Sequence, residues 1–124
     1  MTTTNLTQET FKSTILDNPL VLVDFWAGYC RPCQAFAPVY DRSAQTHPDV
    51  VHAKVDTQAE VELAATLGIR SVPTIMAFRE GVLVYSQPGA MPSAALEDLI
   101  TQVKTLDMTA VRAKIAARKA TPAR

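Results

Sequence analysis

The chain has 124 residues, 48% of them hydrophobic and 19% charged, and its formal net charge is zero. This length favours a single domain that buries its own core without metal or disulfide staples. No stretch approaches the roughly 18 apolar residues of a membrane span, and residues 1–5 have neither the basic nor the apolar region of a secretory signal. We therefore expect a cytoplasmic protein without a membrane partner.

The first predicted elements are a helix, a strand and a second helix. Thr7 is placed to cap the first helix, which Asn18-Pro19 ends. The run from Leu20 to Trp26 is apolar except for one carboxylate, which is typical of a strand buried on both faces of a sheet. The second helix begins at Cys30 or Arg31 and continues to about Thr46.

The rest of the chain predicts a further strand, a third helix, a β-hairpin and two C-terminal helices. The order predicts an α/β fold with a hairpin in its sheet. The expected elements are a strand at Val50 to Val55, a helix capped by Thr57 and ended by Gly68, strands at Thr74 to Phe78 and Val82 to Tyr85, a helix from Ser93 to Leu106 and one over 107–119.

The only two cysteines lie in the sequence Cys30-Arg31-Pro32-Cys33, where the apolar strand gives way to the second helix. Cysteines at this spacing in a first helical turn lie on one side, close enough to bridge. The unpaired N–H groups and the dipole of that turn lower the pKa of the first cysteine, so Cys30 is the expected nucleophile. One thiolate of such a pair attacks a disulfide and the other resolves the mixed disulfide. The pattern favours redox catalysis.

The alternatives are half of a zinc site and a structural bridge. A structural zinc needs four ligands, and the remaining candidates, His47 and His52, are separated by a turn and part of a strand instead of a usual ligand spacing. A structural bridge is less expected in a reducing compartment. We expect no metal and assign no role to either histidine.

Asp24 places a carboxylate in the middle of the apolar strand, where burial of the ionised form is costly. One interpretation is a structural partner for Lys54 on a neighbouring strand. The other is a desolvated acid with a raised pKa that exchanges protons near the cysteines. Its position shortly before Cys30 favours the second interpretation.

Pro73 stands at the start of a predicted strand, where a proline leaves the hydrogen bonds of the sheet undisturbed. Both a trans and a cis bond between Val72 and Pro73 are compatible with that position.

Together these residues resemble the thioredoxin family. The segment from Val23 to Cys33 is similar to the strand and active-site loop of that family, and the segment from Gly68 to Thr74 is similar to the one that holds its cis-proline. The resemblance covers about residues 6–104. Further matches are Pro38 to a helix-kinking proline, Lys54 to a buried lysine, and Gly81 and Gly89 to two later glycines.

The resemblance implies a thioredoxin fold, a central mixed sheet flanked by helices, with an exposed Cys30 as nucleophile and a recessed Cys33 as resolving cysteine. Asp24 would accept the proton of Cys33, and Lys54 belongs to the same site. The backbone of Val72 would hold a client segment as an added strand. The implied substrate-binding residues are Trp26, Tyr29, Ser71, Val72, Pro73, Gly89 and Ala90.

The resemblance also implies the partners. A flavin-containing thioredoxin reductase would supply electrons from NADPH, the clients would be proteins with disulfides, and the chain itself would hold no cofactor. We expect a monomer without a nucleic-acid partner.

The chain departs from the usual pattern of the family at three places. Tyr29 replaces a Trp before the first cysteine, and Arg31 replaces a Gly, so Arg31 and Pro32 are expected to tune the redox potential. The tail beyond about Leu106 has no counterpart in a minimal thioredoxin. Residues 104–124 carry six basic and one acidic side chain, whereas residues 1–103 carry six basic and eleven acidic ones. We therefore divide the chain into a thioredoxin domain at 1–106 and a basic helical extension at 107–124.

Three functions are compatible with this pattern. The first is a protein-disulfide reductase acting through Cys30 and Cys33. The second is a redox-gated or redox-inert binding module that docks a partner through the basic tail, and the third is a thiol oxidant or isomerase of an oxidising compartment. The presence of both cysteines, Asp24 and Pro73 favours the first.

Overall fold

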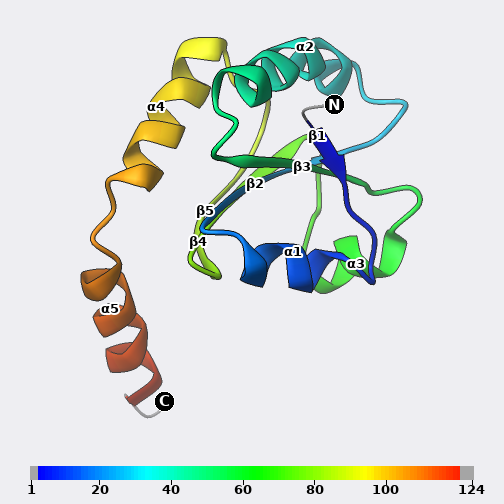
Figure 1. Cartoon of the computed structure of the whole chain (residues 1–124). Helices are drawn as coiled ribbons and strands as arrows, with labels where there is room; N and C mark the ends of the chain where they lie inside the picture. Colours follow the sequence, from blue (N-terminus) through cyan, green and yellow to red (C-terminus); the bar gives the residue numbers. More distant parts are fainter. Residues whose placement is uncertain (1–2, 121–124) are drawn as a thin grey trace.

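The computed structural model describes residues 3–120, which form one sheet and five helices. The strand order is β1-β3-β2-β4-β5, with β1, β3 and β2 parallel and the β4–β5 hairpin joined antiparallel to β2. Helices α1 and α3 cover one face of the sheet, and α2 and α4 cover the other (Figure 1). The elements are β1 (Thr3–Asn5), α1 (Phe11–Asp17), β2 (Leu20–Trp26), α2 (Arg31–Thr46), β3 (Val51–Asp56), α3 (Val61–Thr66), β4 (Thr74–Arg79), β5 (Val82–Pro88), α4 (Ser93–Lys104) and α5 (Met108–Ala120).

Strand β2 lies at the centre of the sheet and is buried on both faces. Val21 and Val23 belong to the core beneath α1 and α3, whereas Leu20 and Leu22 belong to the core beneath α2 and α4. Because side chains alternate along a strand, Asp24 points to the same face as Leu22. The fold therefore brings this carboxylate beneath α2, the helix that follows Cys30.

The predicted α/β fold with a hairpin is confirmed, and so is the extra C-terminal helix. Cys30 caps α2, and Pro32 lies in its first turn, where a missing N–H breaks no helical hydrogen bond. Gly68 follows α3 with a φ of 71°, a conformation that glycine adopts readily at the end of a helix. None of the helices among residues 3–120 combines the length and the apolar character needed to cross a bilayer.

Strand β1 was not predicted from the sequence. It has three residues and pairs in parallel with residues 52–54 of β3. A strand this short has too few residues to show an alternating pattern, and it exists because β3 offers a free edge to pair with. Local sequence carries no signal for such a distant pairing.

The predicted starts of two helices were wrong because neither Thr7 nor Thr57 caps the helix that follows it. The N–H of Thr7 donates to the hydroxyl of Thr10 at 2.9 Å, so Thr7 begins a turn ahead of α1 instead of capping the helix. The hydroxyl of Thr57 donates to the carbonyl of Trp26 at 2.9 Å, and α3 begins only at Val61. Both threonines are engaged in contacts that local propensity does not show.

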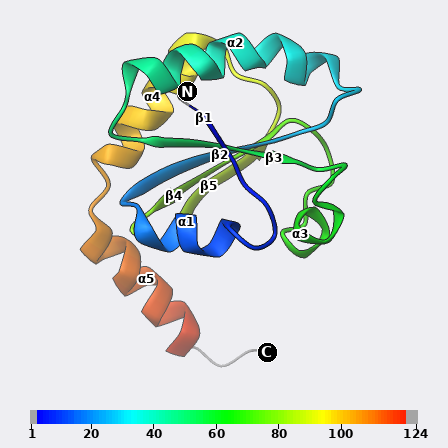
Figure 2. The same ribbon diagram turned by 45° about the vertical axis from the view of Figure 1, so that its right-hand side comes forward.

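Helix α5 lies beside the β4–β5 turn, at the end of the sheet opposite the start of α2 (Figure 2). Three of its apolar side chains face the body: Met108 is buried, and Val111 and Ile115 are half-buried. The predicted basic side chains are exposed, and Arg112 among them binds Glu80 instead of pointing freely to solvent. Residues 121–124 of the predicted extension lie outside the described residues.

Candidate active site

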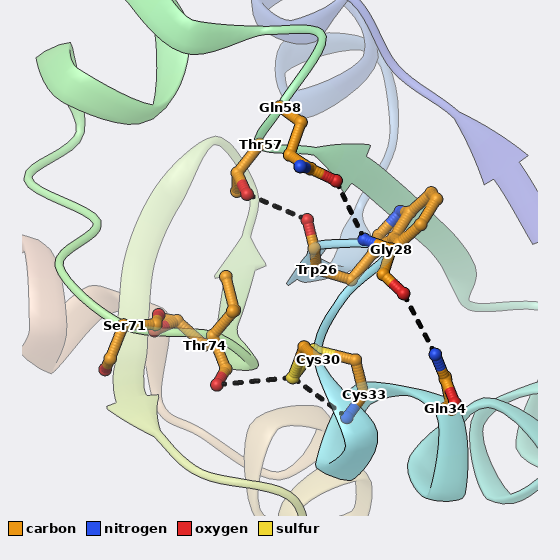
Figure 3. Close-up of a disulfide and its surroundings, with 10 residues drawn as sticks. Trp26, Gly28, Cys30, Cys33, Gln34, Thr57, Gln58, Ser71 and Thr74 are labelled. Carbon is orange, nitrogen blue, oxygen red and sulfur yellow. Dashed lines mark hydrogen bonds between the residues drawn. A yellow bond between two sulfur atoms is a disulfide. The ribbon is translucent and has the colours of Figure 1, made fainter.

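The N-terminus of α2 holds both cysteines. Cys30 is the N-cap residue and forms a disulfide with Cys33, their Cα atoms 5.2 Å apart. The backbone N–H of Cys33 donates to Sγ of Cys30 at 3.1 Å (Figure 3). In the reduced protein, this donor and the positive end of the helix dipole stabilise a thiolate at Cys30. The start of α2 is therefore suited to activate Cys30.

The expectation that Cys30 is exposed is wrong for the disulfide form. Cys30 is 6% exposed and Cys33 is 4% exposed, because both pack with Ala27 and against the half-buried Trp26 and Val72. The two cysteines are therefore distinguished by their surroundings and not by their exposure. Sγ of Cys30 lies 3.6 Å from the carbonyl oxygen of Val72, whereas Cys33 lines a cavity beneath α2.

The loop before β4 faces Cys30. Its Val72–Pro73 bond is cis, as the resemblance implies. The hydroxyl of Thr74 donates to the carbonyl of Ser71 at 2.8 Å, and the N–H of Gly89 donates to the carbonyl of Pro73 at 2.7 Å. These bonds hold the backbone of the loop next to the disulfide.

Two glutamines that sequence reasoning missed hold the loop between β2 and α2. The N–H of Gly28 donates to Oε1 of Gln58 at 3.0 Å, and Nε2 of Gln34 donates to the carbonyl of Gly28 at 2.9 Å (Figure 3). Isolated glutamines form no motif, and the one signal in the sequence is that Gln34 follows Cys33 directly.

A cavity of about 200 Å³ beneath α2 connects Asp24 with Cys33. Asp24 is 1% exposed, and within residues 3–120 its Oδ1 makes no hydrogen bond. Burial raises the pKa of Asp24 to about 7; the charge of Lys54 opposes this shift, and the Asp41 carboxylate adds to it. The predicted rise in this pKa is confirmed. A carboxyl group with such a pKa both accepts and releases a proton near neutral pH.

Lys54 acts on Asp24 through its charge and not through a direct bond. The two residues are neighbours in the β2–β3 register, but no ion pair or hydrogen bond joins them in the described part of the chain. Lys54 is half-buried instead of fully buried, and its amine lies 5.4 Å from the centre of the Trp26 ring. A structural ion pair therefore does not explain the buried carboxylate.

Three of the predicted substrate-binding residues lie next to the disulfide: Trp26 and Val72 pack against it, and Tyr29, which precedes Cys30, is 73% exposed. Trp26 also lines the cavity beneath α2. Ser71, Gly89, Ala90, Arg31 and Pro32 are exposed, Val72 is half-buried and Pro73 is buried.

Both histidines have partners of their own. Nε2 of the buried His52 and Oγ of Ser43 are 2.9 Å apart, and burial lowers the pKa of His52, which favours the neutral ring. Nε2 of His47 lies 2.7 Å from a carboxylate oxygen of Glu97. Within residues 3–120, no group of three or more His, Cys, Asp or Glu side chains is placed to hold a metal.

Comparison with known proteins finds the same family by sequence and by structure. A sequence model described as Thioredoxin matches residues 2–102. A proposed thioredoxin 2 from Streptomyces coelicolor is 52% identical over 118 residues, which span 95% of this chain and 88% of that relative. Thioredoxin 1 from Synechococcus elongatus is 42% identical over 97 residues, or 77% of this chain and 91% of that protein.

Solved structures of thioredoxins share the fold. A mutant thioredoxin from Halobacterium salinarum matches with a TM-score of 0.77 and 35% identity, over 83% of this chain and 91% of that one. Thioredoxin F from spinach chloroplasts matches with a TM-score of 0.77 and 31% identity, over 84% and 95% of the two chains.

These matches cover the sheet, the helix that Cys30 caps and the cis-proline loop, so the geometry and the relatives agree. Thioredoxins are disulfide oxidoreductases that act on disulfide-containing proteins and are generally reduced by thioredoxin reductase. The chain therefore belongs to the thioredoxin family and is a thiol-disulfide oxidoreductase with protein-disulfide reductase activity.

Proposed function

We propose that Cys30 attacks client disulfides and that Cys33 releases the product. The Cys30 thiolate attacks one sulfur of the client disulfide, whose S–S bond breaks while its other sulfur leaves as a thiolate. Cys33 then loses its proton and attacks the Cys30 sulfur of the mixed disulfide, so the second client thiolate leaves. The client gains two electrons, and the chain ends as the Cys30–Cys33 disulfide.

One observation carries this assignment. Cys30 occupies the N-cap of α2 and accepts the N–H of Cys33 at 3.1 Å, so the fold stabilises a negative charge on the Cys30 sulfur. Cys33 sits a turn further into the helix and faces the cavity.

Asp24 and Lys54 serve the resolving step. Asp24 takes the proton of Cys33 across the cavity that both residues line, which is large enough to hold water. Because the pKa of Asp24 is about 7, a large share of this carboxyl is ionised near neutral pH and ready to accept the proton. The charge of Lys54 keeps that pKa from rising further.

Clients dock around the disulfide. An extended client segment pairs with the backbone of Val72 as an added strand, and Tyr29 offers an exposed apolar ring beside it. Arg31 and Pro32 lie between the two cysteines and tune the reduction potential of the pair. The other docking residues are Ser71, Pro73, Gly89 and Ala90, with Trp26 shaping the loop from below.

The physiological partners follow from this chemistry. A flavin-containing thioredoxin reductase passes electrons from NADPH to the chain, and the clients are disulfide-containing proteins of the cytoplasm, where thiols are kept reduced. The protein acts as a monomer. Residues 1–106 form the catalytic domain, and residues 107–124 are a basic extension outside it.

Paired cysteine variants test the order of attack. With insulin as client, Cys33→Ser should accumulate mixed disulfides on non-reducing gels, because the attacking thiolate remains and the resolving one is gone. Cys30→Ser should accumulate none. Circular dichroism of both variants controls for folding. Equal trapping by the two variants, or trapping by Cys30→Ser alone, would show that Cys30 is not the attacking residue.

A further inference from the structure

A second surface lies at the end of the sheet opposite the cysteines. Strand β2 runs from Leu20, paired with Arg79, to the end that leads into Cys30, so the β4–β5 turn and the disulfide are at opposite ends of the sheet. Helix α5 lies beside that turn in both views (Figures 1 and 2). Between β5 and α5 is a groove of about 240 Å³, here named the tail groove, which is lined by Leu83, Val84, Leu106, Val111, Lys114, Ile115 and Arg118.

The tail groove is held in place by contacts at its base. The guanidinium of Arg79 donates to the carbonyls of Val103 at 2.7 Å and Lys104 at 3.0 Å, which fixes the end of α4 before the chain turns into α5. Met108, the first residue of α5, is 6% exposed. The hairpin residue Glu80 binds Arg112 one turn further along α5. These contacts set the distance between the two walls of the groove.

The tail groove combines an apolar floor with a cationic rim. Five of its seven lining side chains are apolar, and Leu83 among them is 48% exposed. The other two are Lys114 and Arg118, which are exposed and make no ion pair with the residues that the structure describes. None of the described residues that line the groove carries a carboxylate. Among residues 3–120, nothing therefore supplies an apolar cover for this surface or the negative charge that would complement its rim.

We propose that the tail groove docks a short protein segment in which carboxylates flank apolar side chains. The apolar side chains would fill the floor, and the carboxylates would pair with Lys114 and Arg118. A nucleic acid would use the cations and leave the floor empty. A bilayer needs an apolar face turned outward, whereas Val111 and Ile115 face β5.

This docking goes beyond the reductase reaction, because it involves neither cysteine. A partner bound at this end of the sheet is tethered to the chain. Tethering raises the effective concentration of that partner at the disulfide. The match to the Streptomyces coelicolor relative spans 118 residues, so it must include at least twelve of the residues that follow Leu106. The extension that forms one wall of the groove is thus not confined to this chain.

Peptide display tests the proposal on the full chain in its disulfide form. We would pan a cysteine-free library of random peptides of about twelve residues, a length that spans a groove of this kind. We expect enrichment of peptides in which Asp or Glu flanks Leu, Ile or Phe. Their binding should weaken with added salt and fall roughly tenfold or more in the double variant Lys114→Glu/Arg118→Glu and in Leu83→Ser.

Matched variants control for charge and for lost apolar surface. Lys12→Glu/Arg42→Glu makes the same change in net charge on exposed positions of α1 and α2, and Val61→Ser removes an exposed apolar side chain from α3. Both controls should bind the peptides as the unchanged chain does. All of these positions are exposed, and unchanged insulin reduction confirms that each variant is folded.

Three outcomes would overturn the proposal. The first is no enrichment of acidic peptides, and the second is equal binding to the groove variants and the unchanged chain. The third is that the chain binds single-stranded DNA of about 20 nucleotides, or phosphatidylserine–phosphatidylcholine vesicles, more tightly than it binds the peptides, and that this binding is lost in Lys114→Glu/Arg118→Glu. That result would assign the surface to a nucleic acid or a membrane.

Discussion

Arg31 is the first residue of α2 and follows Cys30 directly, with its side chain exposed. A guanidinium carries a fixed positive charge, which favours the neighbouring thiolate over the thiol. Stabilising the thiolate stabilises the reduced form of the pair, so the disulfide becomes a better oxidant. Water screens the exposed charge and limits this effect.

Replacing Arg31 with Gly should raise the pKa of the Cys30 thiol and make the reduction potential slightly more negative. Screening keeps the contribution to the order of 1 kcal/mol or less, which corresponds to a shift of about 20 mV. Equilibration with glutathione measures the potential. Arg31→Gln is the control for glycine's added backbone freedom and should shift it in the same direction. A shift toward less negative values in both variants would show that loop geometry, not charge, dominates.

The sequence revealed those site residues that carry an unusual chemical property. A carboxylate in an apolar strand pointed to Asp24, and its burial explains the raised pKa. Gln34 and Gln58 were missed, because each is an ordinary polar residue whose role comes only from its contact with Gly28 in the folded chain. The burial of Cys30 was missed for a similar reason, since Val72 from a distant loop packs against it.

At the scale of elements, α5 contacts the body through the buried Met108, the half-buried Val111 and Ile115, and an exposed ion pair. Met108→Ala should lower the free energy of unfolding by about 2 kcal/mol, because it removes a buried apolar side chain. Arg112→Gln should lower it by less than about 1 kcal/mol, because its pair with Glu80 is exposed to solvent. Urea denaturation of both variants provides the comparison. A larger loss for Arg112→Gln would mean that the ion pair, and not the apolar contact, holds α5.

Within residues 3–120, every element except the three-residue β1 was predicted from the sequence, although the starts of α1 and α3 were wrong. β2 and α2 bury continuous apolar faces, so their patterns are visible in the chain itself. β1 depends on pairing with β3, and the starts of α1 and α3 depend on which backbone group each threonine hydroxyl binds. The β1–β3 pairing and the Thr57 contact are tertiary, whereas the Thr7–Thr10 contact is a local turn that competes with capping of the helix.

At the scale of the whole molecule, Asp24 couples stability to pH. The pKa of this carboxyl is about 7 in the folded chain, against the ordinary aspartate value of 3.8. At pH values between these two pKa values, the folded state binds more protons than the unfolded state. The free energy of unfolding therefore falls as pH rises from about 4 to about 7. Above that range the folded chain carries the full cost of a buried charge.

Asp24→Asn should therefore stabilise the fold at pH 8, by up to about 4 kcal/mol, and change it little below pH 4. It should also slow insulin reduction roughly tenfold or more, because the proton acceptor of Cys33 is lost. Urea denaturation at the two pH values and turnover at pH 7 give the readouts, with the exposed Asp17→Asn as control. Lower stability at pH 8 with unchanged turnover would mean that Asp24 is structural only.

The reduction potential of the Cys30–Cys33 pair tests most directly whether the whole molecule is built as a reductase. Related dithiol proteins range from about −270 mV for reductases to about −120 mV for strong oxidants. The exposed charge of Arg31 moves the potential by only about 20 mV, so we predict a value within a few tens of mV of the reductase end. A potential close to about −120 mV would contradict the account. At that potential the Cys30–Cys33 disulfide would accept electrons from client thiols, and the reduced pair would not reduce client disulfides.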